Sequence, residues 1–115
     1  MTSVKFYRAE DGRLTGFEAC GHAQNRSLGG NQNDLVCGAV SVLTQTGVNA
    51  LEAVAGITPA VELGDGKLRC MLPDNPAGDR EKAQTILETV YVGITEIAKV
   101  KAYSRFIHVD EISKQ

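Results

Sequence analysis

The first part of the chain carries its hydrophobic residues in the pattern of a β-hairpin. β-Branched and aromatic residues at positions 4–9 predict one strand, and residues 13–21 predict its partner. A Glu-Asp-Gly sequence separates the two, and Asp-Gly is a strong signal for a tight hairpin turn. The second of these strands ends just before His22, so we expect that histidine to lie at a strand end.

A second hairpin is predicted in the middle of the chain. Residues 60–63 and 67–72 indicate its two strands, and a Gly-Asp-Gly sequence between them favours a turn. In the later strand, hydrophobic residues such as Leu68 and Cys70 alternate with polar ones, which is typical of a strand with one buried face. A last strand is predicted over residues 103–109.

Two segments with helical spacing separate these strands. The first helix is predicted over residues 34–55, after which Gly56 provides a C-terminal cap and Pro59 prevents continuation. The second helix begins between Asn75, which is followed by proline, and Asp79, the later candidate for its N-cap. Each helix has one apolar stripe and can therefore bury one face. The stripes consist of Leu35, Val36, Ala39, Val40, Leu43, Gly47, Ala50, Leu51 and Val54 in the first helix, and of Ala83, Ile86, Leu87, Val90, Ile94, Ile97 and Ala98 in the second.

The predicted order of strands and helices is ββαββαβ. Two helices with one apolar stripe each can both pack on one face of a mostly antiparallel sheet, and this arrangement is a two-layer α+β sandwich. The chain has 115 residues, a length typical of one domain. We therefore expect a single domain over residues 1–115.

One long polar segment interrupts the pattern between the first hairpin and the first helix. From Ala23 to Asn33 the only large apolar side chain is Leu28, and the segment also contains Gly29 and Gly30. Loops of this length are usually functional or disordered. The paired glycines lack the lysine and hydroxyl residue that complete a phosphate-binding P-loop, so we exclude that function.

The polar segment is flanked by His22 and Cys37, a pair that indicates nucleophilic chemistry. Asp34 precedes the apolar run and is the expected N-cap, which places Cys37 in the first turn of the helix. The helix dipole and the free N–H groups of a first turn lower the pKa of a cysteine, and a neighbouring imidazole can take its proton. Ser41 lies one turn beyond Cys37 on the same side of the helix.

Each of these residues also has a purely structural interpretation. A free cysteine is often a small buried hydrophobe, a histidine at a strand end is often solvated, Asp34 is sufficiently explained as an N-cap, and Ser41 can belong to an ordinary polar face. A zinc site formed by Cys20, His22 and Cys37 is a further alternative, but their spacing is not that of a common zinc motif. We therefore predict no metal and no cofactor.

Composition excludes several other classes of protein. The net charge is −2, and no basic face indicates a nucleic-acid partner. The N-terminal residues lack the apolar core of a secretory signal, and the longest apolar stretch, residues 35–43, is too short to cross a bilayer. The three widely spaced cysteines do not fit a disulfide framework, so we expect a cytoplasmic protein with reduced thiols and no membrane partner.

The candidate site residues also carry a resemblance to a known family. Gly-His-Ala at residues 21–23, a glycine-containing loop, and Asp-Leu-Val-Cys-Gly-Ala-Val-Ser at residues 34–41 are similar to the motifs of the ribosomal-processing cysteine protease family (Prp). The chain resembles members of that family in length and in the order of its predicted strands and helices. The resemblance implies the same two-layer fold and a homodimer.

The resemblance implies a cysteine endopeptidase in which Cys37 is the nucleophile and His22 the base. Its substrate is implied to be the N-terminal extension of a large-subunit ribosomal protein, removed before that protein enters the ribosome. Backbone N–H groups at the start of the first helix are expected to stabilise the oxyanion. The alternative function is a non-catalytic module that binds a ribosomal protein or peptide. The remaining implied site residues are the supporting Asp34 and Ser41, the hinge Gly21, and Leu28, Gly29 and Gly30 in a substrate-binding loop that closes as a lid.

Overall fold

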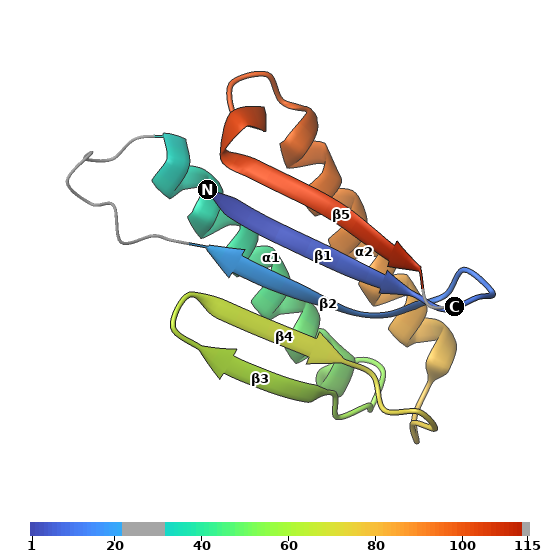
Figure 1. Ribbon diagram of the computed structural model, residues 1–115. Coiled ribbons are helices and arrows are strands. Elements are labelled where there is room, and N and C mark those ends of the chain that lie inside the picture. Colours follow the sequence, from blue (N-terminus) through green and yellow to red (C-terminus); the bar gives the residue numbers. More distant parts are fainter. Residues whose placement is uncertain (22–31, 114–115) are drawn as a thin grey trace.

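The N-terminal hairpin forms the centre of a five-stranded sheet. In the computed structural model, which describes residues 1–21 and 32–113, β1 (Thr2–Arg8) pairs with β2 (Leu14–Gly21) in antiparallel register. Phe6 lies opposite Phe17, and both rings are fully buried. Figure 1 shows these two strands in the middle of the sheet, as the hairpin pattern in the sequence predicted.

The second hairpin extends the sheet on one side and the last strand extends it on the other. β3 (Ala60–Gly64) pairs with β4 (Lys67–Met71), and β4 pairs with β2, in each case antiparallel. β5 (Ile107–Ser113) pairs with β1 in parallel. The strand order is β3-β4-β2-β1-β5, so β3 and β5 are the edges of a mixed, mostly antiparallel sheet.

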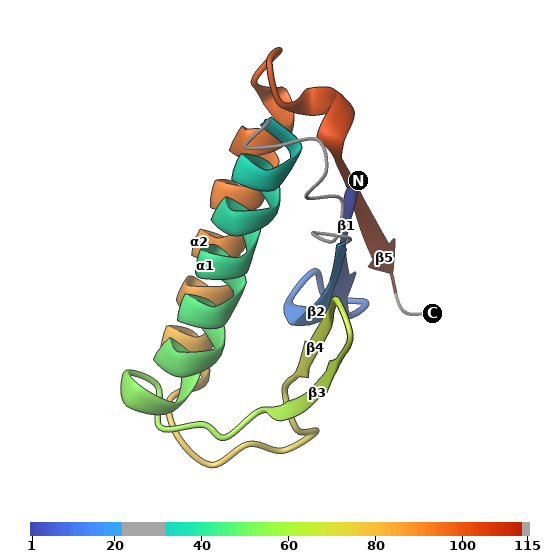
Figure 2. The same ribbon diagram turned by 90° about the vertical axis from the view of Figure 1, so that its left-hand side faces the viewer.

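Both helices lie on one face of this sheet, and the predicted two-layer α+β sandwich is confirmed (Figure 2). α1 (Gln32–Ala53) ends at Gly56, which has a positive φ of 69° and lets Ile57 N–H reach the Leu51 carbonyl at 2.9 Å. This is the predicted glycine C-cap. α2 (Arg80–Lys99) begins at the later candidate, because the Asp79 side chain accepts a hydrogen bond from the Lys82 N–H. No helix in the described ranges is long and apolar enough to cross a membrane.

Two details of the prediction are wrong. The last strand begins at Ile107 and not at 103, since residues Ser104–Phe106 form the short 3-10 helix η2. Tyr103 and Phe106 are partly buried in that turn, so their apolar character imitated a strand. In α1, Leu35 and Val54 are more than half exposed. The buried row instead consists of Val36, Val40, Thr44, Gly47 and Leu51.

The core fills the space between the sheet and the helix pair. Phe6 packs edge-on against Tyr91 of α2 with 5.0 Å between ring centroids, and Cys70 of β4 is fully buried, as its alternation with leucines predicted. The two helices approach closely at Gly47, where an added Cβ would lie 2.7 Å from Cγ2 of Val90. The absence of a side chain at Gly47 therefore sets how near α1 lies to α2.

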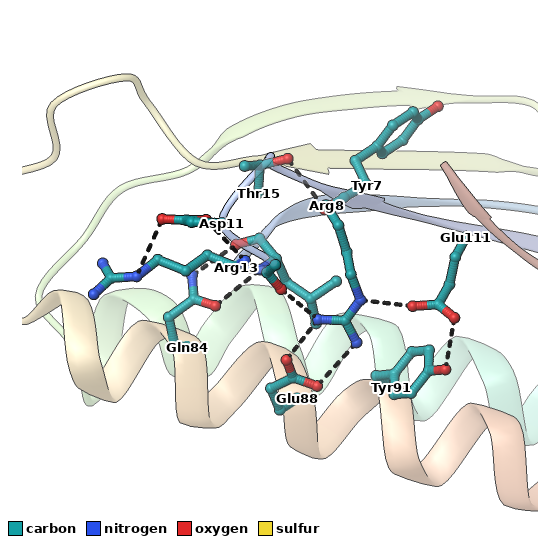
Figure 3. Close-up of polar contacts among 11 residues, drawn as sticks. Tyr7, Arg8, Asp11, Arg13, Thr15, Gln84, Glu88, Tyr91 and Glu111 are labelled. Atoms are coloured by element: carbon teal, nitrogen blue, oxygen red, sulfur yellow. Dashed lines mark hydrogen bonds and ion pairs between the residues drawn. The ribbon is translucent and has the colours of Figure 1, made fainter. Parts of the chain in front are cut away.

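An arginine network fastens the end of the sheet that lies far from Gly21. Arg8 Nε donates to Glu111 of β5 at 2.6 Å, and its Nη1 donates to Glu88 of α2 at 2.8 Å and to the Gly12 carbonyl at 2.7 Å. Its guanidinium also lies over the ring of Tyr91, 5.0 Å from the centroid. Figure 3 shows this side chain reaching all three partners, so one residue joins β1, β5, α2 and the first turn.

Candidate active site

The end of β2 lies directly against Cys37. Gly21 is the last residue of β2 and pairs with Thr2 of β1, and its N–H donates to the Gly66 carbonyl at 2.8 Å. A Cβ added to Gly21 would lie 3.4 Å from Cys37 Sγ and 3.3 Å from Thr2 Oγ1. The sulfur, the threonine hydroxyl and the strand end therefore surround one point on the helix-facing side of the sheet.

A groove of about 630 Å³ opens from this point. One wall is α1, from Cys37 and Ser41 to Asn49, and the opposite wall is the β3–β4 hairpin. Cys37 and Ser41 stand one helical turn apart along the α1 wall, so the side that the sequence assigned to them is confirmed. The groove has the length and openness of a site for an extended chain rather than for a compact small molecule.

The hairpin wall presents exposed apolar side chains to the groove. Val61 and Leu63 alternate along β3 on the side that faces α1, and Leu63 is 79% exposed although it is a large hydrophobe. Val48 of α1 lines the opposite wall. Because β3 is an edge strand, its outer backbone groups have no neighbouring strand. These residues were not predicted as part of a site, although the alternation at 61 and 63 was a usable signal.

The charge at the rim of the groove is mostly compensated. Lys67 Nζ lies 3.1 Å from a carboxylate oxygen of Glu18, which is almost fully buried. The Lys67 ammonium holds the pKa of Glu18 below its ordinary value, and Glu18 in turn raises the pKa of Lys67. Tyr7 adds a hydrogen bond to the same carboxylate at 3.3 Å. The ammonium is thus paired within the sheet and does not make the groove basic.

The predicted position of Cys37 within the helix is wrong. α1 begins at Gln32, so Asp34 lies inside the first turn and is not the N-cap, and Cys37 is in the second turn. The error arose because Asn31, Asn33 and Asp34 are all suitable N-cap residue types. The dipole effect falls off beyond the first turn, and the N–H of a sixth helical residue is directed at the carbonyl four residues back. Activation of the thiol by the helix start is therefore not supported, and neither is an oxyanion site at the Cys37 N–H.

Some predicted site residues cannot be placed. His22, Leu28, Gly29 and Gly30 lie outside the described residues. Gly21 has no positive φ, and its proximity to Cys37 and Thr2 is by itself a sufficient reason for a glycine. Thr2 is a further site residue that was not predicted, because nothing in the sequence brings the first strand to the helix.

The described residues do not assemble a metal site. Across residues 1–21 and 32–113 no group of three or more histidine, cysteine or acidic side chains is close enough to hold a metal ion. All three cysteines are free. Cys20 precedes Gly21 in β2, and alternation along the strand directs its side chain to the face opposite the one that meets Cys37.

Comparison with known proteins identifies the family. The family model described as cysteine protease Prp matches residues 1–108. The chain belongs to the cysteine protease Prp family. Like the other members, it is a cysteine protease, and the peptide-sized groove beside Cys37 agrees with that activity.

Relatives of this Prp family member cover nearly its whole length. The ribosomal processing cysteine protease Prp of Bacillus subtilis (strain 168) is 29% identical over 102 residues, which are 86% of this chain and 88% of that protein. A crystal structure of SMU.848 from Streptococcus mutans has a TM-score of 0.85 and 31% identity, covering 99% of this chain and 96% of that one. The essential ribosomal processing protease Prp from S. aureus, solved with a covalently linked product peptide, has a TM-score of 0.79 and 25% identity, covering 96% and 99%.

Proposed function

We propose that this Prp family member cleaves peptide bonds with Cys37 as the nucleophile and His22 as the base and acid. The observation that carries the proposal is the contact between the end of β2 and the sulfur. Gly21, the residue before His22, has its Cβ position 3.4 Å from Cys37 Sγ. Adjacent Cα atoms are about 3.8 Å apart, so an imidazole at position 22 is within reach of the sulfur.

The proposed reaction has two steps. Cys37 gives its proton to His22, and the thiolate forms a bond to the carbonyl carbon of the substrate. The carbon–nitrogen bond then breaks, the amine leaves with a proton from His22, and a thioester remains on Cys37. In the second step His22 takes a proton from water, the hydroxide attacks the thioester, and the thiol is released. Since the helix start does not activate Cys37, the imidazole is the group on which thiolate formation depends.

The proposed substrate is the N-terminal extension of a large-subunit ribosomal protein. The name of the B. subtilis relative supports processing of a ribosomal protein, and the S. aureus relative holds a covalently linked product peptide. The groove between α1 and the β3–β4 hairpin is long enough for an extended segment. In this proposal Ser41 and Asp34 support the site, the segment over residues 23–33 closes on the peptide, and the enzyme acts as a cytoplasmic homodimer.

The experiment that tests the proposed function is trapping of the acyl-enzyme. The purified protein is mixed with an activated ester of an extension peptide, and intact-mass and peptide mass spectrometry follow the adduct. We expect a mass increase of one acyl group on Cys37 that decays on incubation as the thioester hydrolyses. The alternative function, a binding module, predicts that the peptide binds while Cys37 stays unmodified.

The hairpin wall allows a prediction about substrate binding. Replacing Leu63 with glutamate places a charge on an apolar wall, so we expect KM for an extension peptide to rise about tenfold, while kcat changes little. Leu63 is 79% exposed, so the melting temperature should stay nearly the same. Val92→Glu is the matched control, because Val92 is an exposed hydrophobe on α2 outside the groove. Equal KM values for the two variants would contradict a role of the hairpin in binding.

A further inference from the structure

Thr2 is a buried polar residue that faces the reacting end of the groove. The residue is 3% exposed, and its hydroxyl has no hydrogen-bond partner among residues 1–21 and 32–113. Thr2 nevertheless lines the groove together with Cys37. A buried hydroxyl without a partner is costly, so its orientation toward a ligand site requires an explanation.

The backbone donors near the sulfur are already used. The Gly21 N–H donates to the Gly66 carbonyl at 2.8 Å. The N–H of Cys37 belongs to the helical hydrogen-bond pattern, because Cys37 lies in the second turn of α1. Acyl transfer to a thiolate nevertheless places negative charge on the carbonyl oxygen of the substrate, and this charge needs a hydrogen-bond donor.

We propose that the Thr2 hydroxyl donates a hydrogen bond to this oxyanion, which makes Thr2 a further catalytic residue. The inference depends on the proposed function of Cys37. When Sγ bonds to the carbonyl carbon, the electron pair of the C=O bond moves to oxygen, and the Thr2 O–H holds that charge without giving up its proton. When the carbon–nitrogen bond breaks, the pair returns and the hydrogen bond weakens.

The position of Thr2 fits this role geometrically. Thr2 Oγ1 and Cys37 Sγ lie 3.3 and 3.4 Å from the same point above Gly21, so a carbonyl group attacked by the sulfur there meets the hydroxyl. Ser41 also lines the groove, but it supplies its hydroxyl from α1, whereas Thr2 supplies one from the sheet. The sheet is anchored on both sides of Thr2 by β2 and β5, which keeps the donor in place during the reaction.

The test compares Thr2→Val with Thr2→Ser in the full chain. Valine keeps the shape and removes the hydroxyl, so we expect kcat for an extension peptide to fall roughly a hundredfold with KM unchanged. Serine keeps the hydroxyl and should retain most of the activity. A peptide aldehyde, whose adduct on Cys37 imitates the tetrahedral intermediate, should bind the valine variant more weakly by a similar factor.

Stability measurements separate this role from a structural one. Exchange of an unpaired buried hydroxyl for a methyl group should leave the melting temperature of Thr2→Val equal to that of the wild type or raise it. Thr95→Val on α2 is the control for removal of a threonine hydroxyl outside the groove. If Thr2→Val cleaves within twofold of the wild type, or loses activity only through KM or through a lower melting temperature, the inference is wrong. If the wild type itself neither cleaves the peptide nor forms the adduct, the proposed function is wrong and the inference with it.

Discussion

Cys37→Ala should abolish peptide cleavage while the protein remains folded. Because the sulfur is the atom that forms the acyl-enzyme, its removal should lower kcat/KM by roughly 10⁴–10⁶-fold, and His22→Ala should have an effect of similar size. The two losses should not add in the double variant, since both residues serve the same proton and electron movements. Initial rates with an extension peptide, measured together with circular dichroism of each variant, provide the check.

Cys70→Ala is the control for loss of a thiol. Cys70 is fully buried in β4, and burial raises the pKa of its thiol to about 11, so this residue stays protonated and has no access to substrate. We expect the variant to cleave at close to the wild-type rate, with a lower melting temperature because a small cavity is left in the core. Cleavage that survives in Cys37→Ala, or that disappears in Cys70→Ala at a temperature where it is folded, would refute Cys37 as the nucleophile.

Arg8→Met should produce the largest loss of stability among single changes to a polar group of the described residues. The side chain is 20% exposed and donates to Glu111, Glu88 and the Gly12 carbonyl at 2.6–2.8 Å. Its carboxylate partners are more exposed than it is, so the cost lies between those of a surface and a buried ion pair, about 2 kcal/mol. For a chain of this size the melting temperature should fall by roughly 8 °C. Urea denaturation measures the change directly.

Arg13→Met is the matched control for this prediction. Arg13 belongs to the same hairpin, and Figure 3 shows it beside Arg8, but its ion pair with Asp11 is 3.8 Å long and both side chains are largely exposed. We expect a change of less than about 0.5 kcal/mol. Equal losses in the two variants would show that general charge, rather than the Arg8 network, stabilises this end of the sheet.

The same network gives the expected dependence of stability on pH. The Arg8 guanidinium holds the pKa of Glu111 below its ordinary value of 4.5. A carboxylate whose pKa is lowered by folding stabilises the protein above its unfolded pKa, and this contribution is lost as the pH falls through the folded pKa. The wild type should therefore lose stability as the pH falls below about 4.5, and Arg8→Met should lose less over the same range. The Lys67–Glu18 pair, which also lowers a carboxylate pKa, remains in both proteins.

Local patterns in the sequence predicted the strands and helices well wherever the chemistry of a single turn decided the outcome. The Asp-Gly turn, the glycine after α1 and the aspartate before α2 each satisfy or release backbone groups within a few residues. The start of α1 was mistaken where several adjacent residues suit an N-cap equally well. The last strand was displaced because an apolar 3-10 turn and an apolar strand have the same appearance over a few residues.

The groove was beyond the reach of such patterns. Its two walls come from α1 and from a hairpin that follows more than 20 positions later, and its closed end is formed by Thr2, Gly21 and Cys37 from three different strands and helices. The exposure of Leu63 follows from the space between β3 and α1, which no local pattern contains. The sequence indicated which side chains can carry the reaction, and it did not contain the third dimension in which they meet.

By itself the sequence determined the order of strands and helices, the two apolar helix faces, and the pair of reactive residue types on either side of a polar segment. These properties depend on hydrophobic period and turn chemistry, which act between residues a few positions apart. Only the tertiary structure decided that the end of β2 touches Cys37, that the hairpin faces α1 across a groove, and that Thr2 is buried beside the sulfur. Strand pairing and helix packing decide these contacts, because they join segments that are distant along the chain.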